Sequence, residues 1–177
     1  MTDASAFEAF VRRYQDMVFG LAVRMLGDAS EAEDVSQTVF LKAFERFDAL
    51  SGSDTAPGWL RTVTTNLCLN HLSRYRARWR LFSQRRPGGE EARQPDEERI
   101  AAPASQDVDL QRSEEQARLE RGLRRLPAHQ RAPLVLFHFE ERSYQEIAAL
   151  LGVSLAKVKT DMHRGREALK TLVAGNA

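Results

Sequence analysis

The first quarter of the chain repeats its apolar residues at the three-and-four spacing of an amphipathic helix. These apolar positions are Phe7, Phe10, Val11, Tyr14, Val18, Leu21, Ala22 and Met25. They fall on one helical face, and Gly27 follows them as a typical helix stop. The pattern therefore predicts a first helix that ends at Gly27.

Two more helices are predicted in this half of the chain. Asp28 and Glu31 are spaced as a capping box, which predicts a second helix reaching about Phe47. Residues 48–58 are rich in Gly, Ser and Asp, and Pro57 suits the first turn of a third helix. The apolar stripe of that third helix consists of Trp59, Leu60, Val63, Leu67 and Leu72.

The last third of the chain has the same periodicity in shorter segments. One apolar set (Leu119, Leu123, Leu126) precedes Pro127, and a second set follows it (Leu134, Val135, Leu136, Phe139). Ser143 and Glu146 form another capping box, which opens a short predicted helix, 144–151. Gly152 begins a three-residue turn, and the last helix is predicted to run from about Leu155 to Val173.

The segment between these two parts, residues 83–112, has a different composition. It holds three prolines and a Gly-Gly pair, few large apolar residues, and more acidic than basic side chains. Such a segment buries too little surface to offset its ordering entropy, so it predicts a flexible linker. With no strand-like alternation anywhere, we expect an all-α protein with two small helical domains, 1–82 and 113–177.

Composition narrows the class of protein further. The 177 residues are 42% hydrophobic and 29% charged, with a formal net charge of +1. The single cysteine, Cys68, excludes an internal disulfide and a multi-thiolate metal site, and we expect its thiol to be packed. Neither a membrane span nor a signal peptide is recognisable, so we expect a soluble cytoplasmic protein without direct membrane insertion.

The last fifty residues have the sequence form of a helix-turn-helix. Ala148 is small where two helices would cross, Gly152 suits the turn, and Val158 would face the core. One face of the last helix carries Lys157, Thr160, Asp161 and Arg164. The adjacent face carries Lys159, His163, Arg166 and Lys170. Polar side chains near the start of such a helix read base edges while flanking cations bind phosphates. This pattern favours a DNA-reading module over a helical hairpin with an ordinary solvated face.

Two features of the first domain also suggest partners. Residues 74–86 contain six arginines interleaved with aromatic residues, which suits single-stranded nucleic acid. The alternative is a helix end whose cations balance the helix dipole. In the second predicted helix, Glu33, Asp34 and Gln37 lie on or near one face beside Phe40, without a histidine or Gly-rich loop nearby. That face favours protein docking over catalysis.

Taken together, the chain resembles the extracytoplasmic-function (ECF) group of bacterial sigma factors, small members of the sigma-70 family. The motifs that carry the resemblance are Ala32-Glu-Asp-Val-Ser-Gln-Thr-Val-Phe-Leu-Lys-Ala-Phe44, Trp59-Leu-Arg-Thr-Val-Thr-Thr-Asn-Leu-Cys-Leu-Asn70, Leu126-Pro127, Arg131, Ser143-Tyr-Gln-Glu-Ile-Ala-Ala-Leu-Leu-Gly-Val-Ser154, Val158-Lys159 and Arg164-Gly-Arg-Glu-Ala-Leu169. They cover nearly the whole chain in the family's order.

The resemblance implies a region 2 helical bundle and a region 4 helix-turn-helix that bind core RNA polymerase, through its β′ clamp helices and β flap, and promoter DNA. By position, the polymerase-binding residues are Asp34, Gln37 and Phe40. The residues at the −10 element are Leu50, Val63, Asn66, Asn70, Arg74, Arg76 and Arg78. The residues at the −35 element are Lys157, Lys159, Thr160, His163, Arg164 and Arg166. An anti-sigma partner is expected, and the linker's acidic residues are expected to mimic nucleic acid near the RNA exit path.

Four positions depart from the family's pattern. Leu50 and Ala56 stand where aromatic residues are common, and Lys157 stands where threonine is usual. Asp161 replaces a frequent arginine, and its carboxylate would accept a hydrogen bond from a cytosine amino group or repel phosphate.

Two rival functions are weighed against the sigma factor. A stand-alone helix-turn-helix regulator would share the last fifty residues but leaves the arginine cluster and the docking helix unexplained. An enzyme of nucleic-acid chemistry is disfavoured because the four histidines are scattered and no phosphate loop or metal constellation is visible. We therefore expect no catalytic residue, metal, cofactor or small-molecule substrate.

Overall fold

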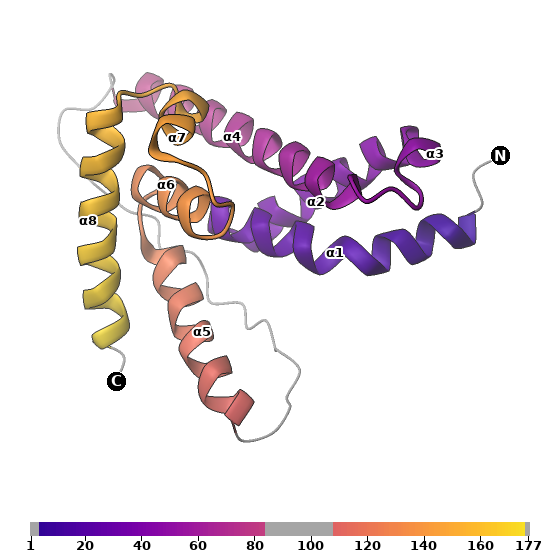
Figure 1. The fold of residues 1–177 in the computed structure, drawn as a ribbon. Helices are drawn as coiled ribbons and strands as arrows, with labels where there is room; N and C mark the ends of the chain where they lie inside the picture. The colour runs from indigo at the N-terminus through magenta and orange to yellow at the C-terminus, as the bar shows by residue number, and fades with distance from the viewer. Residues whose placement is uncertain (1–3, 84–107, 176–177) are drawn as a thin grey trace.

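The computed structural model describes the backbone of residues 4–83 and 108–175, and the side chains of residues 4–73 and 112–175. The described residues form eight helices and no strand, which confirms the predicted all-α class (Figure 1). No helix in this described part is long and apolar enough to cross a membrane.

The N-terminal half is a bundle of α1 (Ala4–Leu26), α2 (Ala29–Glu45), α3 (Phe47–Leu50) and α4 (Ala56–Ser83). The first helix packs against both α2 and α4, and α2 also packs against α4. The core of this bundle follows the apolar stripes predicted from the sequence. It includes Phe10, Val18, Leu21, Ala22, Met25, Val35, Val39, Leu60 and Cys68.

The helix ends in this half follow local signals, with one exception. Gly27 adopts a φ of 73°, and the Asp28 side chain accepts a hydrogen bond of 2.9 Å from the Glu31 N–H. The predicted second helix is interrupted at Arg46, however, and resumes as the short α3. This break places Phe47 in the core, where its ring meets Phe7 edge-on at 5.2 Å between centroids. The second helix therefore ends at Glu45, close to its predicted end near Phe47, and Phe47 is buried as the first residue of α3.

The C-terminal half consists of α5 (Val108–Arg125), α6 (Ala128–His138), α7 (Tyr144–Leu151) and α8 (Leu155–Ala174). The last helix packs against the other three. Both hydrogen bonds of the predicted capping box between Ser143 and Glu146 are present, and Gly152 has a φ of 64°. A Cβ at Gly165 would lie 2.9 Å from Leu134 Cδ1, so glycine allows α8 to approach α6 closely.

The boundaries of the linker differ from the sequence expectation at its C-terminal side. The backbone of α4 continues to Ser83, and α5 begins at Val108, inside the segment 83–112 that the composition assigned to a linker. Residues 84–107, including most of the acidic side chains expected to mimic nucleic acid, lie outside the described residues.

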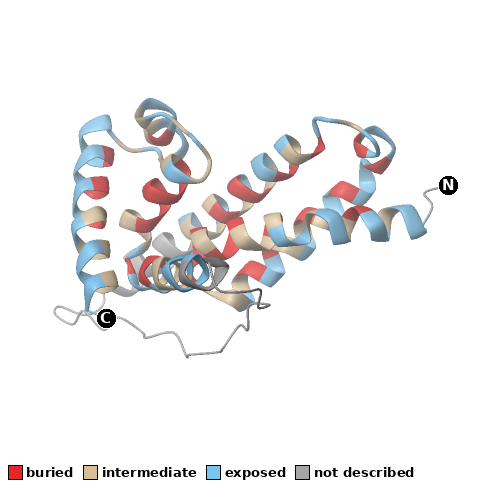
Figure 2. Cartoon of the chain, turned by 60° about the horizontal axis from the view of Figure 1, so that its bottom comes forward, coloured by how far each residue is buried: buried red, intermediate tan, exposed pale blue. Residues whose placement is uncertain are grey.

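The two halves pack against each other. The C-terminal end of α1 lies against α6 and α5 (Figure 1), and the buried apolar residues form one hydrophobic cluster with members from both halves. Figure 2 shows that buried residues line the inner sides of the helices, while the outer side of the helix that leads to the C-terminus is exposed. The sequence predicted two domains joined by a linker, but it did not predict that the two domains contact each other.

Candidate functional site

The exposed face of α2 is the first candidate surface. The helix buries Ala32, Val35, Val39 and Ala43 against the bundle. Asp34 and Gln37 are exposed on the opposite face, and Phe40, at its edge, is partly buried. The three residues expected to bind polymerase therefore lie together on an accessible helix.

Two large apolar residues extend this α2 face beyond the sequence prediction. The side chains of Leu41 and Phe44 are 68% and 48% exposed, although Phe44 also meets the Phe7 ring at 4.9 Å. Leu41 lies four residues after Gln37 and Phe44 three residues after Leu41, so both continue the row of Gln37 along the helix. The sequence could have indicated their exposure, because both residues lie outside the apolar stripe of α2 formed by Ala32, Val35, Val39 and Ala43. An exposed apolar row beside a carboxylate is typical of a protein-binding surface.

The second candidate surface lies on α4. Asn66 and Asn70 are exposed one helical turn apart, and Val63 is partly buried on the same side. The predicted contacts of Arg74, Arg76 and Arg78 fall on residues whose side chains lie outside the described set. Exposed amides along a helix can form hydrogen bonds with base edges.

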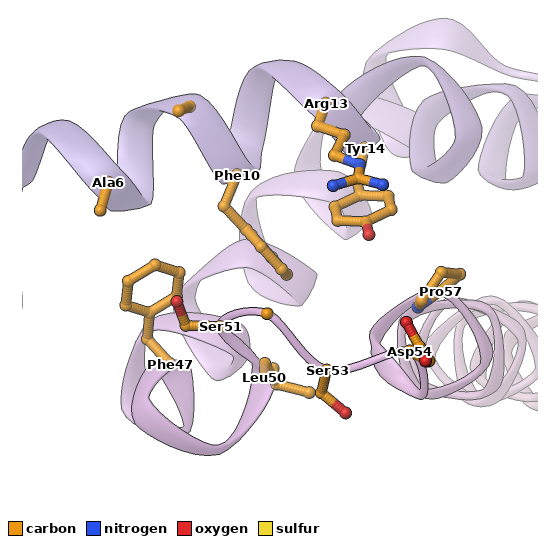
Figure 3. Close-up of a pocket in the computed structure, with 12 residues that line it drawn as sticks. Ala6, Phe10, Arg13, Tyr14, Phe47, Leu50, Ser51, Ser53, Asp54 and Pro57 are labelled. Atoms are coloured by element: carbon orange, nitrogen blue, oxygen red, sulfur yellow. The ribbon is translucent and has the colours of Figure 1, made fainter.

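Leu50 is almost fully buried and lines a pocket between α1 and the loop that precedes α4. The pocket has a volume of about 350 Å³. Figure 3 shows Phe10, Arg13 and Tyr14 on one side, facing Ser53 and Asp54 of the loop; all five line the pocket. It offers aromatic surface, a guanidinium and hydroxyl groups together, which suits a flat polar ligand such as a base.

The departure at Ala56 has a packing explanation. Ala56 is only 1% exposed at the first position of α4. A small residue is thus accommodated at the start of the helix, directly after the loop that lines the pocket.

The third candidate surface is the outer face of α8. Lys159, Thr160, His163 and Arg164 are all exposed within the first half of the helix. The opposite face buries Val158, Met162 and Gly165 against the domain. The N-terminal half of α8 therefore presents cations and hydrogen-bonding groups outward, as a helix that enters a major groove must.

Asp161 corrects one expectation. It was grouped with the residues that face DNA, but it is only 6% exposed and lies at the edge of the core. Its Oδ2 accepts a hydrogen bond of 2.8 Å from Nζ of Lys157, one turn earlier. The carboxylate is thereby neutralised within α8, so neither a contact with cytosine nor repulsion of phosphate follows from this arrangement.

Arg166 also differs from its neighbours. Its guanidinium nitrogens lie 3.4 Å from the Tyr144 hydroxyl, and its Cζ lies 5.6 Å from the centre of the Phe137 ring. The side chain therefore joins α8 to α6 and α7 from a partly buried position.

The remaining reactive group is Cys68. Its side chain is fully buried, and this burial raises the pKa of the thiol to about 12. The sequence prediction of a packed thiol is therefore confirmed. Among the described residues, no three His, Cys, Asp or Glu side chains are grouped so as to hold a metal ion.

Family comparisons agree with this organisation. The model described as Sigma-70 region 2 matches residues 10–78, and the model described as Sigma-70, region 4 matches residues 116–169. The first match covers α2, the α3–α4 loop and most of α4. The second covers the helix-turn-helix and most of α5.

Curated relatives extend the similarity along nearly the whole chain. The ECF RNA polymerase sigma factor SigE of Mycolicibacterium smegmatis is 35% identical over 96% of this chain, which spans 62% of that relative's length. The RNA polymerase sigma-H factor of Pseudomonas aeruginosa is 31% identical, over 94% of this chain and 86% of the relative. The ECF RNA polymerase sigma factor SigW of Bacillus subtilis is 30% identical, over 95% and 89%.

A solved structure shares the fold. The sigma factor RpoE of Bartonella quintana, crystallised with the anti-sigma factor NepR, matches with a TM-score of 0.52 and 23% identity, over 95% of this chain and 96% of that one. Helix-turn-helix regulators would share only the last helices, whereas these matches include the helices of the N-terminal half as well. The chain belongs to the sigma-70 family of RNA polymerase sigma factors, and within it to the extracytoplasmic-function group.

Proposed function

We propose that this chain directs promoter-specific transcription initiation through three surfaces, each with its own partner. The face of α2 binds core RNA polymerase, α4 with the adjacent pocket binds the −10 element, and α8 binds the −35 element. This function requires no covalent chemistry from the chain, so we assign it the role of an initiation factor and not of an enzyme. Because it acts with polymerase, its place is the cytoplasm.

The observation that carries the proposal is the face of α2. Leu41 and Phe44 expose large apolar area beside Asp34 and Gln37, although the bundle beneath has a complete core. Leaving such a row in water has a free-energy cost that a partner's apolar groove would remove. The carboxylate then favours a partner with basic groups, which suits docking on a helix of polymerase.

At the −10 element, we assign the capture of unpaired bases to α4 and the pocket. Asn66 and Asn70 are exposed toward solvent, and the pocket brings together Arg13, Tyr14 and Leu50. Stacking of a base on an aromatic ring contributes about 1–3 kcal/mol. That gain offsets part of the cost of unpairing the duplex.

At the −35 element, we assign the major groove to the first half of α8. Arg164 is exposed and offers the planar fork that binds guanine through two hydrogen bonds. Lys159 and His163 lie exposed along the same helix and are assigned to phosphates. Lys157 is assigned a weaker role because its Nζ already pairs with Asp161.

An anti-sigma factor is the proposed regulator. The sigma factor RpoE of Bartonella quintana was crystallised with one. In this chain, the exposed apolar row on α2 is the surface that such a partner would cover, because covering it would exclude polymerase at the same time.

Run-off transcription tests the proposal. Purified core polymerase is supplied with a pool of promoter fragments, with and without this protein. We expect specific transcripts only when both are present, with shared sequences near −10 and −35. Binding to duplex DNA without polymerase, and no transcripts with it, would instead indicate a stand-alone regulator.

Asp34→Arg tests the docking face within the same assay. Asp34 is exposed, so the variant should keep its fold and lose polymerase affinity by at least about tenfold, because a like charge faces the partner's cations. Asp16→Arg is the matched control, since it makes the same charge change at an exposed position of α1. Equal polymerase affinity of the two variants would refute the assignment of α2.

A further inference from the structure

Lys157 is an unusual residue for the start of α8. It lies in the first turn, where the positive end of the helix dipole disfavours a cation, and no acidic residue shares that turn. Its backbone N–H donates a hydrogen bond of 3.2 Å to the side chain of Ser154, which caps the helix. The same turn belongs to the part of α8 that is assigned to the major groove. A cation placed here against the dipole therefore calls for a functional explanation.

Asp161 holds the ammonium group of this lysine. Nζ of Lys157 donates a hydrogen bond of 2.8 Å to Oδ2 of Asp161, one turn further along α8. The aspartate side chain is only 9% exposed, whereas the lysine side chain is 48% exposed. The carboxylate therefore anchors the pair at the edge of the core, and the ammonium reaches the surface. Because a buried carboxylate is costly unless it is paired, Lys157 is held in this place.

A second ion pair within α8 shows what the burial adds. Nζ of Lys170 lies 2.9 Å from Oε1 of Glu167, but both of these side chains are more than half exposed. An exposed pair of long side chains exchanges readily with water and fixes neither partner. Asp161 has lost that freedom through burial, so it restricts the position of the Lys157 ammonium.

The ammonium of Lys157 still has donors to offer. A lysine carries three N–H donors and no acceptor, and Asp161 uses one of them. Guanine presents two adjacent acceptors, O6 and N7, at its edge in the major groove. Lys157, Thr160 and Arg164 are all exposed, and their spacing of three and four residues places them on one helical face. The ammonium is thus presented on the face that would meet base edges.

The charge of the pair disfavours a role at the phosphates. Lys157 and Asp161 together carry no net charge, so they contribute little to the counterion release that drives phosphate binding. This agrees with a weaker role of Lys157 in affinity. A donor that is fixed in position and balanced in charge suits discrimination between bases better than general attraction to DNA.

We infer that Asp161 is a positioning residue for promoter recognition, which holds the ammonium of Lys157 against a guanine at one position of the −35 element. The pair thereby adds sequence preference with little gain in affinity. This inference rests on the proposed function, because it takes α8 to be the helix that enters the major groove.

Binding of promoter fragments to the full chain assembled with core polymerase tests this role. The probe is a promoter found by run-off transcription, with each base placed in turn at every position of its −35 element. Asp161→Ala releases Lys157, whose half-exposed side chain can extend into solvent, so the fold should be retained. The preference for guanine at one position should fall about tenfold. The slope of log affinity against log salt should steepen by about one for every fragment, because a free cation is added.

Three further variants separate positioning from charge. Asp161→Asn keeps an oxygen that accepts from Nζ, so it should keep a measurable part of the guanine preference that Asp161→Ala loses. Glu167→Ala makes the same charge change and frees Lys170 on the same helix, so it should steepen the salt dependence and leave base preference unchanged. The double substitution Lys157→Ala with Asp161→Ala leaves no buried charge and should lose preference at the same base position as Asp161→Ala.

Three results would overturn the positioning role. The first is unchanged base preference in Asp161→Ala, and the second is an equal loss of affinity for all fragments, which a purely structural role would cause. The third is equal base preference in Asp161→Asn and Asp161→Ala, which would show that charge alone matters.

Failure of the proposed function would look different. The parent protein would then give no specific transcripts with core polymerase, and the positioning role would fall with the function. If Arg164→Ala alters the preference at its own base position while Asp161→Ala alters none, α8 remains the reading helix and only the role of Asp161 is refuted.

Discussion

Replacing Gly27 by alanine tests the contact between the end of α1 and Arg131. The substitution has two separate free-energy costs, one conformational and one steric. Its φ of 73° is one that L-residues occupy at a cost of about 1–2 kcal/mol. The new Cβ would also lie 2.7 Å from Nη1 of Arg131. Moving the guanidinium breaks at least one of its hydrogen bonds to the carbonyls of Met25 and Leu26, at about 1.5–3 kcal/mol. We expect Gly27→Ala to lower the free energy of unfolding by about 2.5–5 kcal/mol, the sum of these two terms.

The chain contains a matched control for the first of these costs. Gly52 has nearly the same φ, 72°, but a Cβ there would meet nothing within 4 Å. Gly52→Ala should therefore be destabilising by about 1–2 kcal/mol only. Urea unfolding followed by circular dichroism measures both variants, with the midpoint shifting at constant slope.

A double-mutant cycle isolates the contact with the arginine. In an Arg131→Ala background, the added Cβ at Gly27 has no guanidinium to displace, so its cost should fall to the conformational part, about 1–2 kcal/mol. Equal destabilisation by Gly27→Ala and Gly52→Ala in the parent protein would refute the close approach of Arg131 to α1.

Three further predictions concern the C-terminal domain and the buried thiol. Arg164→Ala should weaken promoter recognition by about 1–3 kcal/mol at one base position. Binding to single-base variants of the −35 element measures this loss. If no base position shows it, the assignment of Arg164 is wrong. Ser143→Ala removes the cap that receives the Glu146 N–H, so thermal unfolding should show a loss of about 1 kcal/mol; an unchanged midpoint would contradict the capping role. Cys68, with its pKa raised to about 12, should react with a thiol reagent at pH 8 only after unfolding, and rapid reaction of the folded protein would contradict its burial.

The candidate surfaces were largely predictable because they depend on helical periodicity. Once α2 and α8 are helices, the apolar stripe identifies the inner face, and Asp34, Gln37, Lys159 and Arg164 follow on the outer one. Asp161 was misassigned because its angular position lies between the two faces. Whether such a residue is buried depends on the neighbouring helix and on the cation one turn away, and periodicity reports neither.

The pocket beside Leu50 could not be predicted. Its walls come from α1, α3 and the loop before α4, which are separated in the sequence and meet only in the bundle. The resemblance to sigma factors placed Leu50 near the −10 element, but it offered no reason to include Arg13 or Tyr14. Tertiary packing brought these three side chains together.

The sequence by itself determined the all-α class, the helix-turn-helix and most helix ends. These features depend on interactions between residues a few positions apart, such as the Ser143–Glu146 capping box and the left-handed turn at Gly152. The tertiary structure alone decided how the two halves meet. Arg131 stood out in the sequence only as a motif residue, because its acceptors at Met25 and Leu26 lie more than 100 positions away. A buried guanidinium is stable only where hydrogen-bond acceptors are brought to it, and local sequence contains no information about acceptors that lie so far away along the chain.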